Sequence, residues 1–436
     1  MNARERLERY FEFKTLGADW KTEILAGATT FITMAYIVFV NPTILRETGM
    51  PFTAVVAATC LSAAFGSILM GAYARYPIAL APGMGLNAYF TYTVVKGMGV
   101  PWQTALGAVF LSGAAFLILT LAGIRQLIVS AIPAELYSAV AAGVGLFIAF
   151  IGLKNAGIIV PDPATTVTLG NLRDPNTLLA IFGLLLIALL LAWGVRAAML
   201  LGILATTLAG AALGLVSWRP QSYQLSEISA TAFKLDIAST LKIGLVEIVF
   251  VFLFVDLFDN IGTLVAVGKK AQLFVDNKIP RIERIFLADA SATIVGSLTG
   301  TSTVVSYIES SAGVAAGGRT GITAIVTGLL FVAALFVAPL VGAIPAAATA
   351  PALIIVGSFM ASAVGEIDWA DFTIAVPAFL TMMMIPLTFS IANGLAFGFT
   401  TFTLLKIFRG EFRRVNAVVY ILTLLFLVRF YYMGKP

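Results

Sequence analysis

The sequence predicts an all-α polytopic membrane protein with fourteen transmembrane segments, arranged as two seven-segment repeats of opposite orientation. Three observations lead to this prediction: recurring apolar windows, a lopsided distribution of Lys and Arg between alternate loops, and a short sequence repeat between the two halves. Hydrophobic residues make up 60% of the 436 residues and charged residues only 11%, whereas a soluble domain carries about 25% charged residues. This composition argues against a large soluble domain and favours many membrane-spanning helices.

Fourteen apolar windows separated by short polar segments predict the membrane crossings. They fall at residues 23–42, 53–73, 77–95, 101–123, 135–153, 177–194, 197–217, 241–267, 284–299, 303–316, 320–341, 347–364, 371–388 and 390–407. A polar loop at 218–240 is predicted to connect the first repeat, 23–217, to the second, 241–407. The last segment, 408–436, is basic at first and then apolar at 415–432, which predicts either a further span or a helix in the membrane interface.

The basic residues predict the orientation of the chain. If residues 1–22 are cytoplasmic, alternate loops place 18 Lys and Arg residues on the cytoplasmic side and 7 outside, with two near the C-terminus unassigned. Positive residues gather on the cytoplasmic side of membrane proteins, so a cytoplasmic N-terminus is predicted. Residues 1–22 lack the pattern of a signal peptide. The net charge of +5 is scattered over the loops, so no nucleic-acid partner is predicted.

The two halves share a sequence repeat at one fixed offset. The tetrapeptide Ala131-Ile132-Pro133-Ala134 recurs 212 residues later as Ala343-Ile344-Pro345-Ala346. Three further residues match at the same offset: Gly145, Phe147 and Ala149 correspond to Gly357, Phe359 and Ala361. An odd number of spans in each half turns the second copy upside down. Inverted repeats of this kind place the binding site near the middle of the membrane, where broken helices meet.

The third and the tenth windows contain stretches that are unsuited to a continuous helix. In the third window, Pro77, Pro82 and Gly83 interrupt the apolar run, and in the tenth, residues 300–309 are β-branched and rich in hydroxyls, which favours an extended chain. Each window is therefore predicted to hold a short extended segment that leads into a half-helix. Non-helical backbone at this depth is tolerated only where it is buried in protein or lines a polar cavity. The two half-helix starts would bring free N–H groups to the centre.

Acidic residues inside the apolar windows are the first candidates for a function. Asp256 and Asp259 of the eighth window are three residues apart, so both can face one cavity. A carboxylate at the centre of a bilayer costs about 2.5–3.5 kcal/mol, which predicts a substrate or proton role for at least one of them. The alternative is that one caps a helix or packs against polar neighbours. Glu247 is interpreted as interfacial, and Asp289 of the ninth window as a structural residue that pairs with a basic loop residue.

Polar residues of the broken windows are predicted to bind the substrate. Glu309 follows the extended segment of the tenth window, where its carboxylate, with the Ser310 hydroxyl beside it, can accept ring N–H groups of a flat heterocycle; the alternative is a plain helix-start carboxylate. Asn87 at the mirror position of the third window offers donors and acceptors together, unless it only caps a helix. Gly85 would let the backbone approach a planar ring closely. Thr30 of the first span either lines the same cavity or bonds within its own helix.

The sequence contains no histidine, and its single cysteine, Cys60, lies in an apolar run. Proton coupling therefore falls to the carboxylates, with Asp256, Asp259 and Glu309 as candidates. An aspartate pair with hydroxyls and backbone carbonyls can also hold Na⁺, and the residues alone favour neither ion. The sequence shows no metal-ligand cluster and no nucleophile–base pair, so it predicts a protein without a metal site or cofactor that is not an enzyme.

At these residues the chain resembles the AzgA-like purine permeases of the nucleobase–cation symporter superfamily, which is related to the nucleobase–ascorbate transporters. Four segments carry the resemblance, which extends over nearly the whole chain: Gly27–Tyr36, Ala81–Phe90, Phe254–Leu264 and Glu309–Gly321. The resemblance implies import of adenine, guanine or hypoxanthine with protons across the bacterial inner membrane, by alternating access and in a homodimer. It also implies a core domain of spans one to four and eight to eleven, and a gate domain of the other six.

The resemblance further implies which residues contact the substrate. The family's Gly and Asn of the third span fall on Gly85 and Asn87, and its glutamate of the tenth span falls on Glu309. Its acidic residue of the eighth span falls on Asp256 or Asp259, with Asp259 preferred. The rival interpretation is a transporter of an anion such as sulfate or bicarbonate with a similar inverted-repeat fold. Acidic residues at the centre argue against it, because anions are bound by basic residues or bare helix ends.

Overall fold

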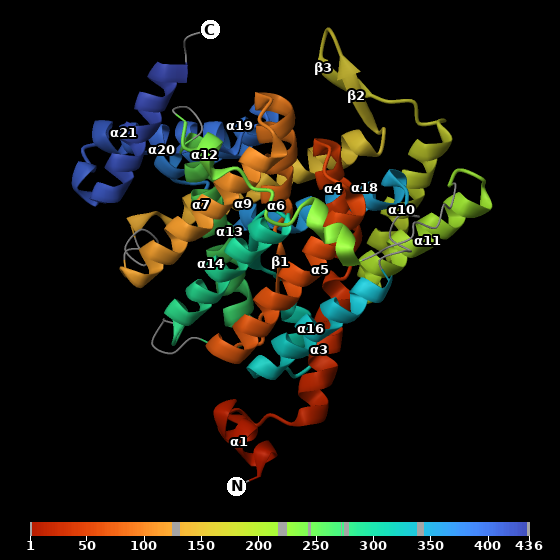
Figure 1. Ribbon diagram of the computed structural model, residues 1–436. Helices are drawn as coiled ribbons and strands as arrows, with labels where there is room; N and C mark the ends of the chain where they lie inside the picture. The colour runs from red at the N-terminus through yellow and green to blue at the C-terminus, as the bar shows by residue number, and fades with distance from the viewer. Residues whose placement is uncertain are drawn as a thin grey trace. The chain divides into compact units, whose positions relative to one another are not determined.

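The computed structural model describes residues 2–123, 131–216, 225–242, 246–271, 273, 279–337 and 344–433, and most of them are helical (Figure 1). Two compact units are formed by discontinuous parts of the chain. Unit 1 comprises Met1–Leu117 and Gly152–Leu353, and unit 2 comprises Ile118–Ile151 and Ile354–Pro436. Unit 1 includes the sixth and seventh windows, which the family resemblance assigns to the gate domain. The division into core and gate therefore stays a prediction.

The predicted windows correspond to helical elements throughout the described parts of the chain. The first repeat contains α3 (Trp20–Met34), α4 (Ile37–Leu45), α5 (Phe52–Leu69), η2 (Met70–Ala74), β1 (Leu80–Pro82), α6 (Met84–Ala88), η3 (Tyr89–Gly97), α7 (Trp102–Leu121), α9 (Ala134–Asn155), α10 (Pro175–Ala192) and α11 (Ala198–Ala212). The second contains α13 (Val246–Lys270), α14 (Ile282–Thr299), β4 (Val304–Ser306), α15 (Ser310–Ala315), α16 (Gly321–Ala334), η5 (Leu335–Val337), α18 (Ala346–Ala361), η6 (Ser362–Glu366), α19 (Phe372–Thr388) and α20 (Ile391–Phe408). Among the described residues, 7 helices are long and apolar enough to cross a membrane, and further apolar helices are shorter. The count of fourteen crossings stays a prediction.

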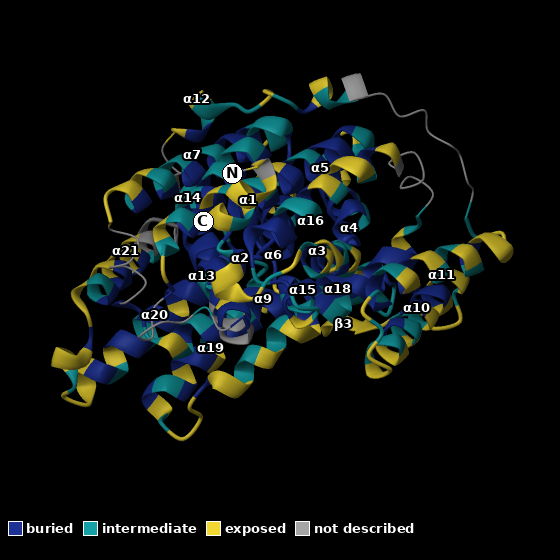
Figure 2. Ribbon diagram, turned by 90° about the horizontal axis from the view of Figure 1, so that it is seen from below, coloured by how far each residue is buried: buried dark blue, intermediate teal, exposed yellow. Residues whose placement is uncertain are grey.

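Apolar surface on the outer helices indicates that lipid surrounds the protein. Only 28% of the apolar window of α10 is buried, and Leu185 of α10 and Leu208 of α11 are 65% and 71% exposed. Figure 2 shows exposed residues along both helices, whereas buried residues gather around α6 and α13. Large apolar side chains so exposed over whole helices suit the hydrocarbon of a bilayer and not water. The chain is therefore a multi-span membrane protein.

The remaining elements lie between the windows or at the ends of the chain. They are α1 (Ala3–Tyr10), α2 (Phe13–Leu16), η1 (Arg46–Thr48), β2 (Ile159–Asp162), β3 (Thr166–Leu169), η4 (Leu225–Ala230), α12 (Ile237–Thr240), η7 (Phe412–Arg414) and α21 (Ala417–Met433). The sequence did not predict the β2–β3 hairpin, although Pro161-Asp162-Pro163 is a turn signal. The Asp162 carboxylate accepts the N–H groups of Ala164 and Thr165 at 2.8 Å each and closes the turn. An all-α fold is thus correct for the spans and incomplete for this loop.

The apolar run at 415–432 forms most of α21, which packs along α20 within unit 2. Thr423 and Thr403 share a hydrogen bond of 2.7 Å between the two helices, and the rings of Phe426 and Phe399 lie 6.0 Å apart. The opposite face of α21 is apolar and exposed, with Leu424 at 62%. One face of α21 is therefore a helix-packing surface and the other is suited to lipid.

The two extended segments predicted in the third and tenth windows pair with each other. Strands β1 and β4 form an antiparallel ribbon in which Ala81 lies opposite Val305 and Leu80 opposite Ser306. The ribbon continues beyond the strands through two hydrogen bonds, from Gly83 N to Thr303 O at 2.9 Å and from Tyr307 N to Ala79 O at 3.0 Å. Residues of the first strand correspond to residues of the second at an offset of 224, as Leu80 does to Val304. Replacing each residue of one of these bonds by its counterpart gives the other bond. The antiparallel ribbon therefore has a local two-fold axis, as expected where the predicted inverted repeats meet.

The glycines paired by the sequence repeat, Gly145 and Gly357, lie against each other in unit 2. A Cβ atom on Gly145 would stand 2.6 Å from the carbonyl oxygen of Gly357 and 2.8 Å from the nitrogen of Ala361. A Cβ atom on Gly357 would overlap the carbonyl of Gly145 and stand 2.8 Å from the nitrogen of Ala149. Each glycine thus contacts the other glycine and the residue four positions after it, as in a two-fold symmetric interface. Both positions therefore require glycine, and the reciprocal contact is the one expected from the predicted inverted repeat.

Parts of several predictions lie outside the described residues. They include Ala343 of the second tetrapeptide, residues 217–224 at the end of the seventh window and in the connecting loop, residues 243–245 of the eighth window and residues 338–341 of the eleventh. The starts of α9 and α18, which follow the two tetrapeptides, are equivalent: Leu136 N donates to Pro133 O at 3.1 Å and Ala348 N to Pro345 O at 3.0 Å.

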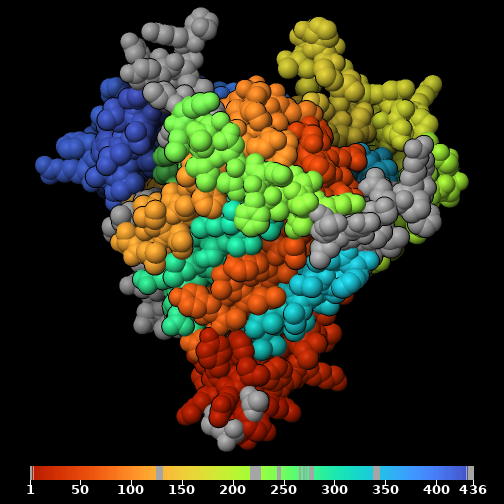
Figure 3. Space-filling model, viewed as in Figure 1, coloured from red at the N-terminus to blue at the C-terminus, as the bar shows by residue number. Residues whose placement is uncertain are grey.

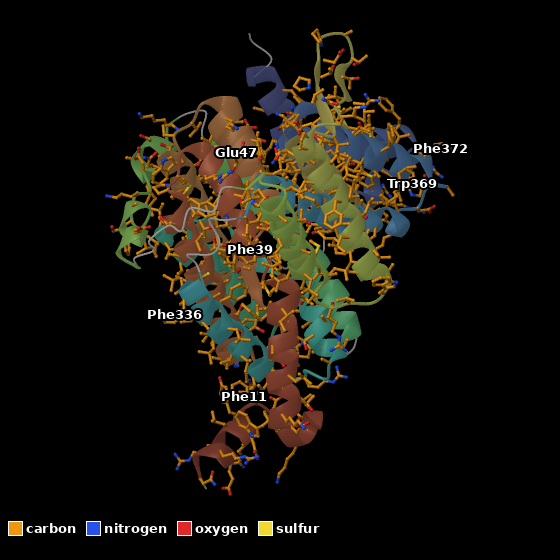
Figure 4. All side chains as sticks on the ribbon, turned by 90° about the vertical axis from the view of Figure 1, so that its right-hand side faces the viewer. Phe11, Phe39, Glu47, Phe336, Trp369 and Phe372 are labelled. Atoms are coloured by element: carbon orange, nitrogen blue, oxygen red, sulfur yellow. The ribbon has the colours of Figure 1, made fainter. Side chains whose placement is uncertain are left out.

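The N-terminal segment is held against unit 1 by aromatic and charged contacts. Phe11 is buried in a cluster with Phe13 and Ile322, and Glu12 forms ion pairs of 3.2 Å with both Arg75 and Arg281. Figure 3 shows this segment beneath the adjoining strips of α5, α14 and α16. Figure 4 places Phe11 at one end of the first span and Glu47 at the other. The segment therefore ties α5 and α14 together at the end of the bundle where the N-terminus lies.

A buried carboxylate joins the first span to α16. Glu23 of α3 is fully buried. It accepts the backbone N–H groups of Arg319, Thr320 and Thr323 at 2.8, 3.1 and 3.2 Å, and the Thr323 hydroxyl at 2.6 Å. These are the free N–H groups of a helix start, and a carboxylate also gains from the positive end of the helix dipole. Glu23 therefore stabilises the contact between α3 and the start of α16.

Glu23→Ala is expected to lower the free energy of unfolding by about 3 kcal/mol, because it leaves several buried N–H groups without an acceptor. The measurement is the thermal midpoint of the purified protein in detergent. Glu283→Ala, at an exposed position in the first turn of α14, is the matched control and should leave the midpoint unchanged. Equal midpoints for the two variants would show that the Glu23 contacts contribute nothing.

Candidate substrate site

Hydroxyl groups satisfy the outer edges of the β1–β4 ribbon. A two-stranded ribbon leaves backbone groups unpaired along both edges, and the membrane interior supplies no water for them. The Ser67 hydroxyl of α5 accepts the N–H of Leu80 at 2.9 Å and donates to its carbonyl at 3.0 Å. The Thr293 hydroxyl of α14 accepts the N–H of Val304 at 3.1 Å and donates to its carbonyl at 3.0 Å. The two strands are therefore fixed to α5 and α14 in the same way.

Glu309 stands at the start of α15 and is held by Tyr36. It is the N-cap residue of that helix, as predicted, and is half-buried. Tyr36 lies in the break between α3 and α4, is 1% exposed and donates its hydroxyl to Glu309 Oε1 at 2.6 Å. Tyr36 occupies only one of the two carboxylate oxygens. The break in the first span thus brings a donor to the carboxylate of the tenth.

Asp259 of α13 lies beside the same half-helix starts. Its Oδ2 atom is 3.6 Å from the position that a Cβ atom on Gly83 would occupy, and Gly83 is the N-cap residue of α6. The charges of Glu309 and Asp289 both act on Asp259. Gly262, one turn further along α13, is exposed and has no atom within 4 Å of its Cβ position. Asp259 and Glu309 are therefore neighbours beside open space.

The two aspartates of the eighth window differ in solvent exposure. Asp259 is half-buried, whereas Asp256 is fully buried. Asp259 also lies beside Gly83 at the start of α6 and within range of the Glu309 charge. The arrangement therefore favours Asp259 over Asp256 as the residue that contacts a ligand.

The remaining predicted residues of the broken windows are buried around the ribbon. Ser310 uses its hydroxyl to accept the N–H of Ala79 at 3.0 Å, so it supports β1. Gly85 and Asn87 are both buried in α6, and neither amide atom of Asn87 makes a hydrogen bond in the described parts of the chain. Asn87 lies one turn inside α6, whereas Glu309 is itself a cap residue. The two therefore occupy different helical positions, and the predicted mirror relation between them is only approximate.

Thr30 lies in a helix-packing contact. It is fully buried, and a Cβ atom on Gly313 of α15 would overlap its hydroxyl. That hydroxyl makes no hydrogen bond within the described residues. The structure thus places Thr30 where α3 packs against α15, next to Gly313, which lies one helical turn after Glu309.

Three residues near the site were missed or misinterpreted at the level of sequence. Asp289 is fully buried in α14 and its charge acts on Asp259, whereas the sequence indicated only a structural residue that pairs with a basic loop residue. An ionisable residue inside an apolar window was a sufficient signal for it. Tyr36 and Asn260 carried no comparable signal, because Tyr and Asn also occur in spans without any site role. Within the described residues, no group of three or more acidic or cysteine side chains is arranged to hold a metal ion.

Comparisons with known proteins agree with the resemblance noted in the sequence. Residues 21–397 match the profile of a family described as the Permease family. The adenine permease AdeP of Escherichia coli is 45% identical over 97% of this chain and 95% of its own length. The guanine/hypoxanthine permease PbuG of Bacillus subtilis is 46% identical over 98% of this chain and 100% of its own length.

Solved structures share the fold at low sequence identity. The transmembrane domain of the cyanobacterial bicarbonate transporter BicA superposes with a TM-score of 0.66 at 14% identity, over 84% of this chain and 95% of that domain. Identity at this level shows the fold alone. The match along nearly the full sequence shows more: the chain belongs to this permease family, the nucleobase–ascorbate transporter group that its sequence resembles.

Proposed function

We propose that this protein is a secondary active transporter that imports purine nucleobases, namely adenine, guanine or hypoxanthine, by proton symport. The observation that carries the proposal is the pair of half-buried carboxylates, Asp259 and Glu309, beside the start of each half-helix. Relatives with 45% and 46% identity are named as adenine and guanine/hypoxanthine permeases. Purines carry ring N–H groups, for which ionised carboxylates are strong acceptors.

The mechanism follows from the repulsion between the two carboxylates. Two negative charges in a poorly solvated site repel each other, and a proton on either one removes the repulsion. A purine that donates an N–H group to Glu309 binds best when its neighbour Asp259 is neutral. Proton and purine therefore load together, and the site then opens to the other side of the membrane by alternating access. Tyr36 holds the Glu309 carboxylate in place throughout.

The anion-transport alternative is disfavoured by the same residues. BicA shares the fold, but a fold does not determine the substrate. Asp259, Asp289 and Glu309 give the site a negative field that would repel sulfate or bicarbonate. Anion carriers place basic residues or bare helix ends at such a position.

Uptake of radiolabelled hypoxanthine into proteoliposomes tests the proposal. Accumulation is expected when the outside is acidic, and a proton ionophore should abolish it. A sodium gradient without a pH gradient should give no accumulation; accumulation there would replace the proton by Na⁺ as the coupling ion. Uptake of sulfate or bicarbonate in place of any purine would overturn the proposal.

The proposal extends to a homodimer in the bacterial inner membrane with a cytoplasmic N-terminus. The family resemblance supports the first two features, and the excess of Lys and Arg in alternate loops supports the third. Labelling of a cysteine introduced at position 2 from one side of intact cells would test the orientation.

The hydroxyls that fix the ribbon are expected to affect transport through the geometry of the site. Ser67→Ala or Thr293→Ala should lower kcat/KM for hypoxanthine about tenfold, because each leaves a strand N–H and carbonyl without a partner. Ser67→Thr and Thr293→Ser keep the hydroxyl and should retain most activity. Ser62→Ala and Ser297→Ala are matched controls on the same helices, since those hydroxyls bond only within their own helix. Equal uptake by all the alanine variants would exclude a positioning role.

A further inference from the structure

The two-fold relation between the repeats assigns a counterpart to Tyr36. The offset of 224 residues that relates β1 to β4 also relates Glu23 to Glu247, and each of these glutamates lies in the first turn of its helix. Along the same helices the offset relates Tyr36 to Asn260. By this offset Asn260 corresponds to Tyr36, although Asn260 lies within the continuous helix α13 and Tyr36 lies at the break between α3 and α4.

The counterpart of the contact between Tyr36 and Glu309 lies at the start of α6. The same offset relates Glu309 to Gly85, and α13, which carries Asn260, packs against α6. On one side of the axis a tyrosine meets a carboxylate. On the other side the corresponding residues are an asparagine, Asn260, and a glycine, Gly85, which carries no side chain. The protein therefore supplies a carboxylate on one side of the axis and only the Asn260 amide on the other.

Two buried asparagines, Asn260 of α13 and Asn87 of α6, have side-chain amides without hydrogen-bond partners in the described parts of the chain. Asn260 and Asn87 are both 0% exposed, and in the described parts of the chain neither the oxygen nor the nitrogen of either amide makes a hydrogen bond. Buried polar groups are nearly always paired, because an unpaired one costs free energy. Asn260 directly follows Asp259, and Asn87 lies in the helix whose cap residue approaches Asp259. Both amides therefore belong to the neighbourhood of the carboxylate pair.

We propose that Asn260 and Asn87 form an amide subsite that recognises the purine edge carrying N1 and the substituent at C6. This inference rests on the proposed function and adds the basis of its selectivity. An ionised carboxylate only accepts hydrogen bonds, whereas an amide both donates and accepts. Glu309 thus accepts a ring N–H group with the protonated Asp259 beside it, and the amides accommodate either the 6-oxo group of hypoxanthine and guanine or the 6-amino group of adenine. Asn260 is a specificity-determining residue of the site.

The test compares adenine with unsubstituted purine, which differs from it only by the 6-amino group. Each compound competes with radiolabelled hypoxanthine for uptake by the wild-type protein and by the Asn260→Ala and Asn260→Ser variants. In the wild type, adenine should compete about tenfold better than purine, since a site built around a polar group disfavours a ligand that lacks it. In both variants the two compounds should compete almost equally.

The control is Asn41→Ala, a buried asparagine of α4 whose amide nitrogen already donates to Thr59 and Thr301 at 2.7 and 3.0 Å. This variant is expected to keep the preference for adenine, whatever happens to its abundance. An unchanged preference in both Asn260 variants would overturn the inference, and so would an equal loss of preference in Asn41→Ala. If the variants transport too slowly, the same ratio is measured by thermal-shift titration of the purified proteins. A wild-type protein that imports no purine would instead refute the proposed function.

Discussion

Glu309→Gln is expected to reduce purine uptake by at least about 30-fold in kcat/KM while the protein still reaches the membrane. Glutamine preserves the size of the side chain and can still bond Tyr36, which lies 2.6 Å from Oε1. What it loses is the negative charge that accepts a ring N–H group. Loss of a charged partner from a poorly solvated hydrogen bond costs about 2–5 kcal/mol, which corresponds to a factor of about 30 to several thousand.

The measurement is initial uptake of labelled hypoxanthine, normalised to the amount of protein in the membrane. Glu283→Gln is the matched control, because Glu283 is an exposed glutamate in the first turn of α14. Uptake by Tyr36→Phe should lie between the uptake of these two variants, with a loss of about tenfold, because this change removes one neutral hydrogen-bond donor from the Glu309 carboxylate. Uptake by Glu309→Gln within twofold of the wild type would exclude Glu309 from the site.

Asp259→Asn is expected to impair transport, whereas Asp256→Asn is expected to impair stability, although the residues are only three positions apart. Asp259 is half-buried beside Gly83 and within range of the Glu309 charge. Its loss should abolish proton-driven accumulation, because an amide at this position can neither take up nor release the coupled proton. Asp256 is fully buried, so its loss should mainly lower the thermal midpoint and the abundance of the protein.

Two measurements distinguish the roles of the two aspartates. The first is accumulation of hypoxanthine at an imposed pH gradient, and the second is the KM of the Asp256 variant after correction for abundance. The KM of Asp256→Asn should stay within about threefold of the wild type, as expected when an interaction with the substrate is not lost. A strongly raised KM in Asp256→Asn, together with normal uptake by Asp259→Asn, would reverse the assignment.

Much of the fold was predictable because the membrane imposes simple rules on the sequence. Spans must be long and apolar, and the predicted windows coincide with helices. The interruptions at Pro82 and Gly83 marked β1, and the β-branched residues Val304 and Val305 marked β4. The repeat was visible in Gly145 and Gly357 because each backbone contacts the other too closely for any side chain.

The contacts that define the site could not be predicted, because they join residues that are far apart in the sequence. Tyr36 and Glu309 are separated by 273 positions, and hydropathy does not record which buried hydroxyl faces which carboxylate. The same holds for Ser67 and Thr293, which look like ordinary small polar residues of a span until the strands that they hold are located. The choice between Asp256 and Asp259 likewise required the orientation of α13.

A structure of the protein with bound hypoxanthine tests the central claim most directly. The claim predicts a ring N–H group at hydrogen-bond distance, about 2.9 Å, from a carboxylate oxygen of Glu309, with Asp259 against the same ligand. A purine found away from both carboxylates would contradict it.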